Sequence, residues 1–187
     1  MPAVPVQKVS NGMKLVFNDD VWTIVEFAHR KPGKGGAFVR IRMKSLTTGR
    51  VHEANFQASE RVEEANVSYQ RMSYLYQDGT DYVFMNASTY DQIPIDQDLL
   101  GEKTQFLTEN LEVSVVFWDD RIVAAELPAK VELRVVQTDT VDRGNTATNV
   151  MKDATLETGY VAQVPLFVNT GDIVVIDTRD GAYEARL

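Results

Sequence analysis

Cysteine is absent from the 187-residue sequence, which excludes disulfide frameworks, thiolate metal sites and cysteine nucleophiles, and is compatible with a reducing compartment. Histidine is scarce as well: His29 and His52 are the only two, and neither belongs to an HExxH or similar metal-binding motif. We interpret His52 as a strand residue and His29 as a strand residue or a phosphate contact. The sequence therefore predicts no metal site and no cofactor.

Long apolar runs are also missing. No stretch approaches the roughly 18 residues needed to cross a bilayer, and the first residues lack the apolar segment of a secretion signal. Positive charge is in deficit, because 19 Lys and Arg face 27 Asp and Glu, for a net charge of −8. Such a chain does not coat nucleic acid or a membrane surface through bulk charge, so any RNA contact must be local. We expect a cytoplasmic protein without a membrane partner.

Short β-branched and aromatic runs separated by Gly, Asp and Asn dominate the sequence and predict a mostly β fold. These runs are residues 14–17, 21–27, 37–43, 67–76, 81–85, 112–118, 122–127 and 130–136. Residues 77–80 and Asp119-Asp120 predict two hairpin turns. One helix is predicted, over residues 98–110, with its start capped by Asp96 or Asp98 and its apolar face plugging a barrel. That face consists of Leu99, Leu100, Phe106 and Leu107.

Two interruptions divide the chain into three pieces of similar size. A polar, acidic stretch occupies residues 59–65, and Pro128 separates two strand-like runs. We expect domains at residues 1–64, 65–127 and 128–187, each the size of a small five-stranded barrel. Residues 1–64 carry 10 Lys and Arg against 7 Asp and Glu, whereas residues 65–128 carry 3 against 11. The first piece is thus the one expected to approach an anionic partner.

The most unusual local sequence is the stretch HRKPGKGG at residues 29–36, which lies between two strand-like runs and predicts a long hairpin tip. Pro32 restricts the backbone, while Gly33, Gly35 and Gly36 permit positive φ, so that Lys34 stands at an apex with nothing bulky beside it. Taken alone, the stretch is more typical of a flexible, solvated turn whose basic residues keep it soluble. It does not fit a phosphate-binding Walker A loop, because Gly35 follows the lysine and a strand, not a helix, comes next.

Other candidate features have simpler interpretations. The aromatic residues could form a base-stacking platform, but alternating aromatics on strands more often form barrel core. They are Trp22, Tyr69, Tyr74, Tyr76, Tyr82, Phe84 and Trp118. The acid pairs Asp19-Asp20, Glu63-Glu64 and Asp119-Asp120 are interpreted as solvated turns or linkers. The polar stretch at residues 143–149 is a loop whose small side chains suit contact with a nucleic-acid backbone. No nucleophile or acid–base constellation is present, which argues against an enzyme.

Several segments together resemble the bacterial elongation factor P family from end to end. They are residues 31–35 (KPGKG), 72–76 (MSYLY), 82–85 (YVFM), 154–159 (ATLETG) and 164–168 (VPLFV), with Gly171-Asp172, Asp177-Thr178, Gly181 and Tyr183. The resemblance implies a KOW-type, SH3-like barrel followed by two OB-fold barrels in an L-shaped arrangement similar to transfer RNA. This agrees with the division into three pieces.

The resemblance also implies a monomeric, non-enzymatic translation factor that binds the 70S ribosome, its RNA and its proteins, between the peptidyl and exit sites, and relieves stalling at consecutive prolines. Lys34 matches the family's tip lysine, which a modifying enzyme commonly extends toward the CCA end of the peptidyl-site tRNA. Lys31, Pro32, Gly33 and Gly35 form the tip loop around it, and His29 and Arg30 are candidate RNA contacts.

A loop in the third piece matches a family loop implied to meet the exit-site mRNA codon, and Tyr183 and Arg186 match a C-terminal contact surface. The loop residues are Arg143, Gly144, Asn145, Thr146 and Ala147. This chain departs from the family pattern nearby: Asn145 replaces an aspartate, Thr140-Val141 replaces Pro-Gly, and Lys152-Asp153-Ala154-Thr155 replaces Lys-Pro-Ala-Thr. These departures bear on the mRNA contact and leave the tip unchanged.

Alternatives remain open at this point. An elongation-factor-P-like paralogue resembles the tip less well, because it tends to lack the Pro-Gly-Lys-Gly context. A generic OB-type module for single-stranded RNA would use its tyrosines as stacking platforms. A small enzyme would require a titratable constellation, which the sequence does not offer.

Overall fold

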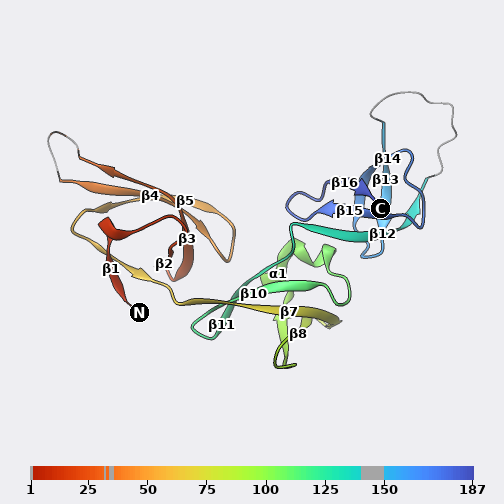
Figure 1. Cartoon of the computed structure of the whole chain (residues 1–187), viewed down its shortest axis with the longest axis horizontal. Helices are drawn as coiled ribbons and strands as arrows, with labels where there is room; N and C mark the ends of the chain where they lie inside the picture. The colour runs from red at the N-terminus through yellow and green to blue at the C-terminus, as the bar shows by residue number, and fades with distance from the viewer. Residues whose placement is uncertain (1, 32, 34–35, 140–149) are drawn as a thin grey trace. The chain divides into compact units, whose positions relative to one another are not determined.

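The computed structural model describes residues 2–31, 33, 36–139 and 150–187 (Figure 1). Strands dominate this part of the chain. The helical segments within it are short: η1 Val6–Lys8, α1 Gln97–Leu100 and η2 Gly101–Phe106. The predicted mostly β fold is therefore confirmed.

The first sheet has six strands in the order β1-β6-β2-β3-β4-β5. Its strands are β1 Ala3–Pro5, β2 Lys14–Phe17, β3 Asp20–Arg30, β4 Phe38–Ser45, β5 Val51–Gln57 and β6 Arg61–Glu64. Period-two alternation is strict in β4, where Val39, Ile41 and Met43 are fully buried and the residues between them are exposed. The acid pair Glu63-Glu64 lies in β6, paired with β1 and β2, so its interpretation as a solvated turn is wrong. Val62 beside it is buried in the core, and this burial holds the segment in the sheet.

Two further sheets have five strands each, in the orders β11-β10-β7-β8-β9 and β14-β13-β12-β15-β16. The second sheet contains β7 Val67–Asp78, β8 Asp81–Asn86, β9 Gln92–Asp96, β10 Glu112–Trp118 and β11 Arg121–Glu126. The third contains β12 Lys130–Thr138, β13 Met151–Leu156, β14 Val161–Pro165, β15 Ile173–Asp177 and β16 Tyr183–Arg186. Both predicted hairpin turns are confirmed: Gly79 has φ +62° between β7 and β8, and Asp119 and Asp120 have positive φ between β10 and β11.

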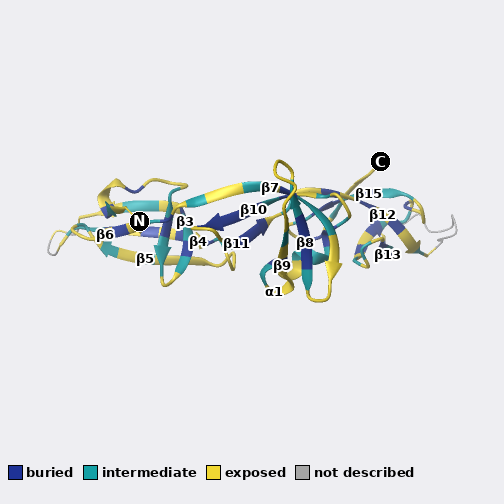
Figure 2. Ribbon diagram, turned by 90° about the horizontal axis from the view of Figure 1, so that it is seen from below, coloured by how far each residue is buried: buried dark blue, intermediate teal, exposed yellow. Residues whose placement is uncertain are grey.

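The chain forms two compact units, Met1–Gln70 with Val115–Ala125, and Arg71–Ser114 with Glu126–Leu187. In the first unit, the ends of β10 and β11 add to the core beside the first sheet, and these strands are largely buried in Figure 2. Trp118 and Val123 pack there in one cluster with Val21, which is completely buried. The first sheet is therefore stabilised by residues that come from much later in the chain.

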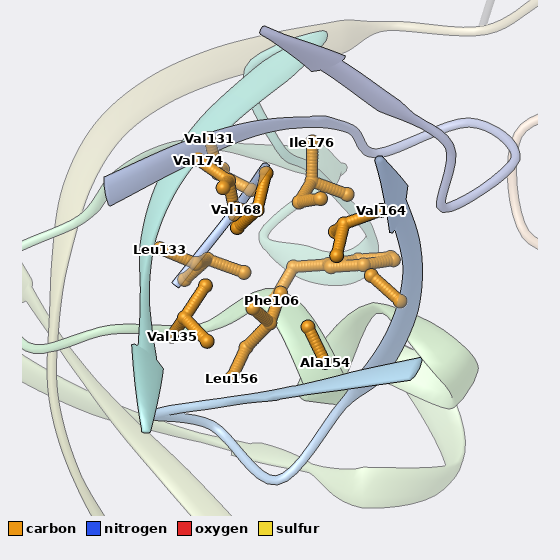
Figure 3. Close-up of a cluster of buried hydrophobic side chains, with 11 residues drawn as sticks. Phe106, Val131, Leu133, Val135, Ala154, Leu156, Val164, Val168, Val174 and Ile176 are labelled. Atoms are coloured by element: carbon orange, nitrogen blue, oxygen red, sulfur yellow. The ribbon is translucent and has the colours of Figure 1, made fainter. Parts of the chain in front are cut away.

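In the second unit, the third sheet curves around a core that also includes side chains from outside its strands, among them Phe106 and Val168. Phe106, the last residue of η2, lies among the buried side chains of β12 to β15 (Figure 3). Its ring meets that of Tyr160 edge to face at 5.1 Å between centroids. Phe106 thus fills the third core as the sequence predicted, and Leu100 and Leu107 of the same segment are buried as well.

The predicted helix over residues 98–110 is only partly correct. Asp96 caps its start, because its carboxylate accepts a hydrogen bond from the Asp98 backbone N–H at 2.7 Å. The α-helix ends at Leu100, since Gly101 adopts φ +57°, and a 3-10 helix continues to Phe106. The residues that follow are not helical. From the apolar spacing, the burial of this segment was predicted correctly. The prediction of one continuous helix was wrong, because the α-helix ends at Leu100.

The predicted aromatic core needs one correction. Tyr82, Phe84 and Trp118 are buried as expected, and Trp22 and Tyr74 are half-buried. Tyr69 and Tyr76 are 48% and 51% exposed, so these two are surface residues. Tyr74 pairs with Phe84, and a bulge in β7 between Tyr74 and Tyr76 then places Tyr76 opposite Val83 instead of Tyr82, which turns its ring to the other face of the sheet.

Candidate nucleic-acid interface

The candidate tip belongs to the long hairpin formed by β3 and β4 in the first sheet (Figure 1). The two strands stay paired up to Arg30 and Phe38, and Ala58 donates a backbone hydrogen bond to the Ala37 carbonyl at 2.9 Å. The buried side chains of β4 anchor the hairpin in the core of the sheet. Both strands are therefore fixed in the first sheet up to Arg30 and Phe38.

A polar cluster fastens the opposite end of the hairpin. The Asp20 carboxylate accepts hydrogen bonds from the hydroxyls of Ser45, at 2.7 Å, and Thr47, at 2.9 Å, and from the Val21 backbone N–H at 2.8 Å. Ser45 is only 2% exposed, so its hydroxyl depends on this partner. Asp20 was expected to be a solvated turn residue; the structure instead makes it the acceptor that joins β3 to the end of β4.

At the tip itself, His29 and Arg30 are the exposed final residues of β3, and the His29 ring lies edge-on to Phe27 at 5.7 Å. Lys31 is also exposed. A Cβ added at Gly33 would meet nothing within 4 Å, which agrees with the expectation of open surroundings. The predicted tip residues Pro32, Lys34 and Gly35 lie outside the described residues.

The glycines that are described around the tip do not use their conformational freedom. Neither Gly33 nor Gly36 has the positive φ that the sequence interpretation allowed them. A Cβ at Gly36 would lie 3.4 Å from the Gln57 side-chain oxygen. That distance is an ordinary van der Waals contact with a flexible side chain, so neither the backbone conformation nor the available space requires glycine at residue 36.

The predicted loop of the third sheet, Arg143, Gly144, Asn145, Thr146 and Ala147, lies outside the described residues together with Thr140-Val141. Both sides of this segment are held in place. The Lys152 ammonium donates to the Asp139 carbonyl at 2.6 Å, and the Thr138 hydroxyl donates to the Asp153 carbonyl at 2.7 Å. These bonds join the end of β12 to the start of β13.

Lys152 is a structural residue that the sequence interpretation missed. It was noted only as part of a departure from the family pattern, yet it is 8% exposed and lies on the same buried face of β13 as Ala154 and Leu156. Burying an ammonium without a partner is costly, so its bond to the Asp139 carbonyl is what makes the position tolerable. The signal was available in the sequence, because period-two alternation places residue 152 on the same face as residues 154 and 156.

Tyr183 and Arg186, the predicted C-terminal contact surface, both lie on β16. Tyr183 is half-buried against the third core. The Arg186 guanidinium lies over the Phe167 ring at 5.1 Å and donates to the Asp172 carboxylate at 3.3 Å. The Asn169 backbone N–H, and to a smaller extent Arg186, hold the pKa of Asp172 below its ordinary value. Arg186 is thus oriented by neighbours while its side chain stays 41% exposed.

Within the described part of the chain, no group of three or more His, Asp or Glu residues is arranged to hold a metal ion. The same residues include no helix that is long and apolar enough to span a membrane.

Three family descriptions match the chain in succession. The KOW-like domain of elongation factor P matches residues 6–62, its OB domain matches residues 67–125, and its C-terminal domain matches residues 131–186. These matches confirm the predicted fold class of KOW-like and OB domains. The translation initiation factor 5A structure from Methanococcus jannaschii has a similar fold, with a TM-score of 0.52 at 21% identity over 68% of this chain and 92% of that one.

Three relatives match over nearly their full length. The chain is 45% identical to elongation factor P of Symbiobacterium thermophilum over 183 residues, 98% of this chain and 99% of the relative. It is 48% identical to elongation factor P of Corynebacterium kroppenstedtii over 95% of both chains. It is 47% identical to that of Synechocystis over 94% of both. The chain therefore belongs to the elongation factor P family and is a translation elongation factor.

Proposed function

We propose that this factor binds the ribosome between the peptidyl and exit sites and stimulates peptide-bond formation at consecutive prolines. The observation that carries the proposal is the match to elongation factor P along the whole chain, combined with a β3–β4 hairpin whose anchored strands lead to the tip sequence Pro32-Gly33-Lys34-Gly35. Lys34 reaches the CCA end of the peptidyl-site tRNA, extended by a group that a modifying enzyme adds to it.

Positioning, not acid–base chemistry, is the proposed mechanism. Proline is a constrained secondary amine, so the attacking and peptidyl groups meet in poor geometry, and correct placement of reacting groups is worth several kcal/mol of barrier. The lysine ammonium has three donors on a flexible stem and suits the sugar-phosphate of a tRNA end. A guanidinium would impose a planar fork on the same space.

The remaining contacts belong to the same proposal. Beside the tip, the exposed side chains of His29, Arg30 and Lys31 contact RNA. Residues 143–147 meet the exit-site codon region, and Tyr183 and Arg186 form a contact surface on the third domain. The bonds that Lys152 and Thr138 make beside residues 140–149 support this proposal, because a loop that meets RNA needs fixed ends.

Lys34→Ala tests the tip in an in vitro translation assay that compares a polyproline reporter with a proline-free one. The substitution is expected to lower synthesis through prolines to the rate seen without factor, and to leave the proline-free reporter unchanged. Stability should stay within about 0.5 kcal/mol, because the surroundings at Gly33 are open. The matched control is Lys8→Ala. Lys8 is an exposed lysine at the end of η1, and its replacement should leave the activity unchanged.

If the Lys34→Ala protein relieves the proline delay as well as the parent, the tip mechanism is wrong for this chain. Intact-mass measurement on protein purified from its native host tests the modification. If the fully active protein has the mass of the unmodified chain, Lys34 acts without an added group and no modifying enzyme is needed.

A second candidate function is sequence-tolerant binding of single-stranded RNA. Tyr69 and Tyr76 favour it, because both rings are about half exposed and could stack on bases. In that case the parent would bind RNA but would give no proline-specific effect in the same assay.

A further inference from the structure

The strand β5, Val51–Gln57, is the last strand of the first sheet and pairs with β4 along its whole length. Among the strands that the structure describes, none pairs with its other side. A strand that is paired on one side only presents a row of unpaired backbone N–H and C=O groups, with which another strand can pair. Five of the seven residues of β5 are exposed, so this edge is open to a partner.

Most other strands at the sheet edges have features that protect them from pairing. The strands β1, β9 and β14 each contain a proline, which cannot donate a hydrogen bond to a neighbouring strand. The strand β16 has only four residues, and the middle of β11 is buried. By contrast, β5 contains neither proline nor glycine, and its register with β4 is regular. It therefore offers a regular, unprotected edge of seven residues.

Charge is another common protection of an edge strand, and on β5 it is neutralised. Glu53 is the only acidic residue of the strand, and it forms an ion pair with Arg40 of β4. Asn55 lies on the same face and is uncharged. Like charges that lie opposite each other oppose strand pairing. The ion pair removes most of the repulsion that Glu53 would exert on a neighbouring strand.

The sequence of β5 is complementary to itself. A second copy that runs antiparallel with Ala54 opposite Ala54 pairs all seven residues. On the outer face, each Glu53 then lies opposite Asn55 of the second copy, whose amide can donate a hydrogen bond to the carboxylate. Val51 lies opposite Gln57 on the same face. No two like charges lie directly opposite each other in this register.

On the inner face, the same register places His52 opposite Phe56 of the second copy. Within one copy, the Phe17 ring is stacked on the His52 ring at 5.6 Å between centroids and meets the Phe56 ring edge to face at 6.0 Å. This cluster is incompletely covered, because His52 is exposed and the two phenylalanines are half-buried. Aromatic pairs that lie opposite each other on neighbouring strands stabilise a sheet.

We propose that two copies of this chain pair antiparallel along β5, with the two-fold axis at Ala54, and join their first sheets into one continuous sheet. Other registers fit less well. A shift by two residues in either direction leaves five residues paired, and one of these shifts places Glu53 opposite Glu53. A shift by one residue would place inner-face side chains opposite outer-face side chains. The complementarity over all seven residues favours a second copy over an unrelated extended segment.

This pairing is independent of the proposed function, because β5 carries none of the residues that the proposed function places against RNA. Seven residues bury less surface than a standard interface of about 1,600 Å², so we expect a weak dimer with a dissociation constant of about 10 to 100 µM. At lower concentrations the chain is then the monomer that the family resemblance implies.

Sedimentation equilibrium of the full chain, from about 1 µM to about 1 mM, measures the dimer. Asn55→Glu places a second carboxylate opposite Glu53, twice in each dimer, and should raise the dissociation constant about tenfold. Asn55→Lys places an ammonium there and should lower the dissociation constant about threefold. Within its own chain, Asn55 lies opposite Arg40. A glutamate at this position therefore fits the monomer's own sheet, and circular dichroism verifies that both variants fold.

The controls make the same changes at an exposed residue outside β5. Asn11→Glu and Asn11→Lys should leave the dissociation constant within about twofold of the parent. Because the chain has no cysteine, Ala54→Cys introduces a single thiol. The Cα atoms of directly opposite residues lie about 4.5 to 5.5 Å apart, which a disulfide can span. Mild oxidation should cross-link the Ala54→Cys protein rapidly and the Asn11→Cys protein slowly.

A parent that stays monomeric at about 1 mM would overturn the proposal and leave the β5 edge to another extended segment. Asn55 variants that behave like the Asn11 controls would overturn it as well. A dimer in which the Ala54→Cys protein is cross-linked no faster than the Asn11→Cys protein would use another edge of the chain, and would equally refute pairing along β5.

Discussion

The Tyr160 hydroxyl donates a hydrogen bond to the Gly181 carbonyl at 3.0 Å, and the ring lies so close to Gly181 that no side chain fits there. A Cβ added at Gly181 would lie 2.0 Å from the Tyr160 hydroxyl oxygen. Gly181 also has φ +73°, a conformation that favours glycine. The turn between β15 and β16 is therefore closed against the third core by one tyrosine and one glycine.

Gly181→Ala is expected to destabilise the protein by about 2 to 4 kcal/mol, since it combines a left-handed backbone with a steric clash. Tyr160→Phe removes only the hydrogen bond and should cost about 1 kcal/mol. Urea unfolding of both variants measures the difference. As a control, Gly33→Ala should change stability little, because its added Cβ meets nothing within 4 Å. A Gly181→Ala protein as stable as the Gly33→Ala protein would contradict this account.

Asp177, the last residue of β15 before this turn, has a carboxylate with a strongly lowered pKa. The Arg179 side chain, and then the Arg179 backbone N–H, donate hydrogen bonds to Asp177 and hold its pKa at about 2, against an ordinary value of 3.8. Because the folded-state pKa lies below the unfolded one, Asp177 stabilises the fold above about pH 4, and this contribution is lost as the pH falls toward 2.

At pH 5, Asp177→Asn should accordingly lower the free energy of unfolding. The gap in this free energy between the variant and the parent should become smaller as the pH approaches 2. Denaturant unfolding at several pH values between 2 and 6 measures this. Asp91→Asn makes the same change of charge at an exposed position, and its difference from the parent should stay nearly constant. A difference between the Asp177→Asn protein and the parent that does not change with pH would rule out the proposed linkage.

Local chemistry explains what could be predicted from the sequence. The β10–β11 turn was predicted from Asp119-Asp120, and both residues adopt the positive φ that short polar side chains tolerate. The strands β2 and β10 have the predicted limits, because turn residues follow β2 and lie on both sides of β10.

Long-range packing explains what the sequence could not supply. Glu63 and Glu64 have strand geometry because β6 pairs with two other strands, and no local signal outweighs their polarity. Asp20 has a specific role because Ser45 and Thr47, 25 and 27 residues later, reach it. The predicted domain limits at residues 64 and 127, and the L-shaped arrangement of the domains, stay predictions.

Phe106 is the clearest example of such a long-range relationship, and it gives the last prediction. Its position at the end of η2 follows from the helix break at Gly101, while its burial, at 3% exposure, depends on strands that begin 24 residues later. Phe106→Ala should cost about 3 to 5 kcal/mol, because the cavity would open in the middle of the third core. Phe167→Ala is the control: the ring is 56% exposed, and its loss should cost less than about 1 kcal/mol. Urea unfolding measures both, and amide exchange should accelerate in β13 and β14 of the Phe106→Ala protein. Equal small losses in the two variants would show that the third core does not depend on Phe106.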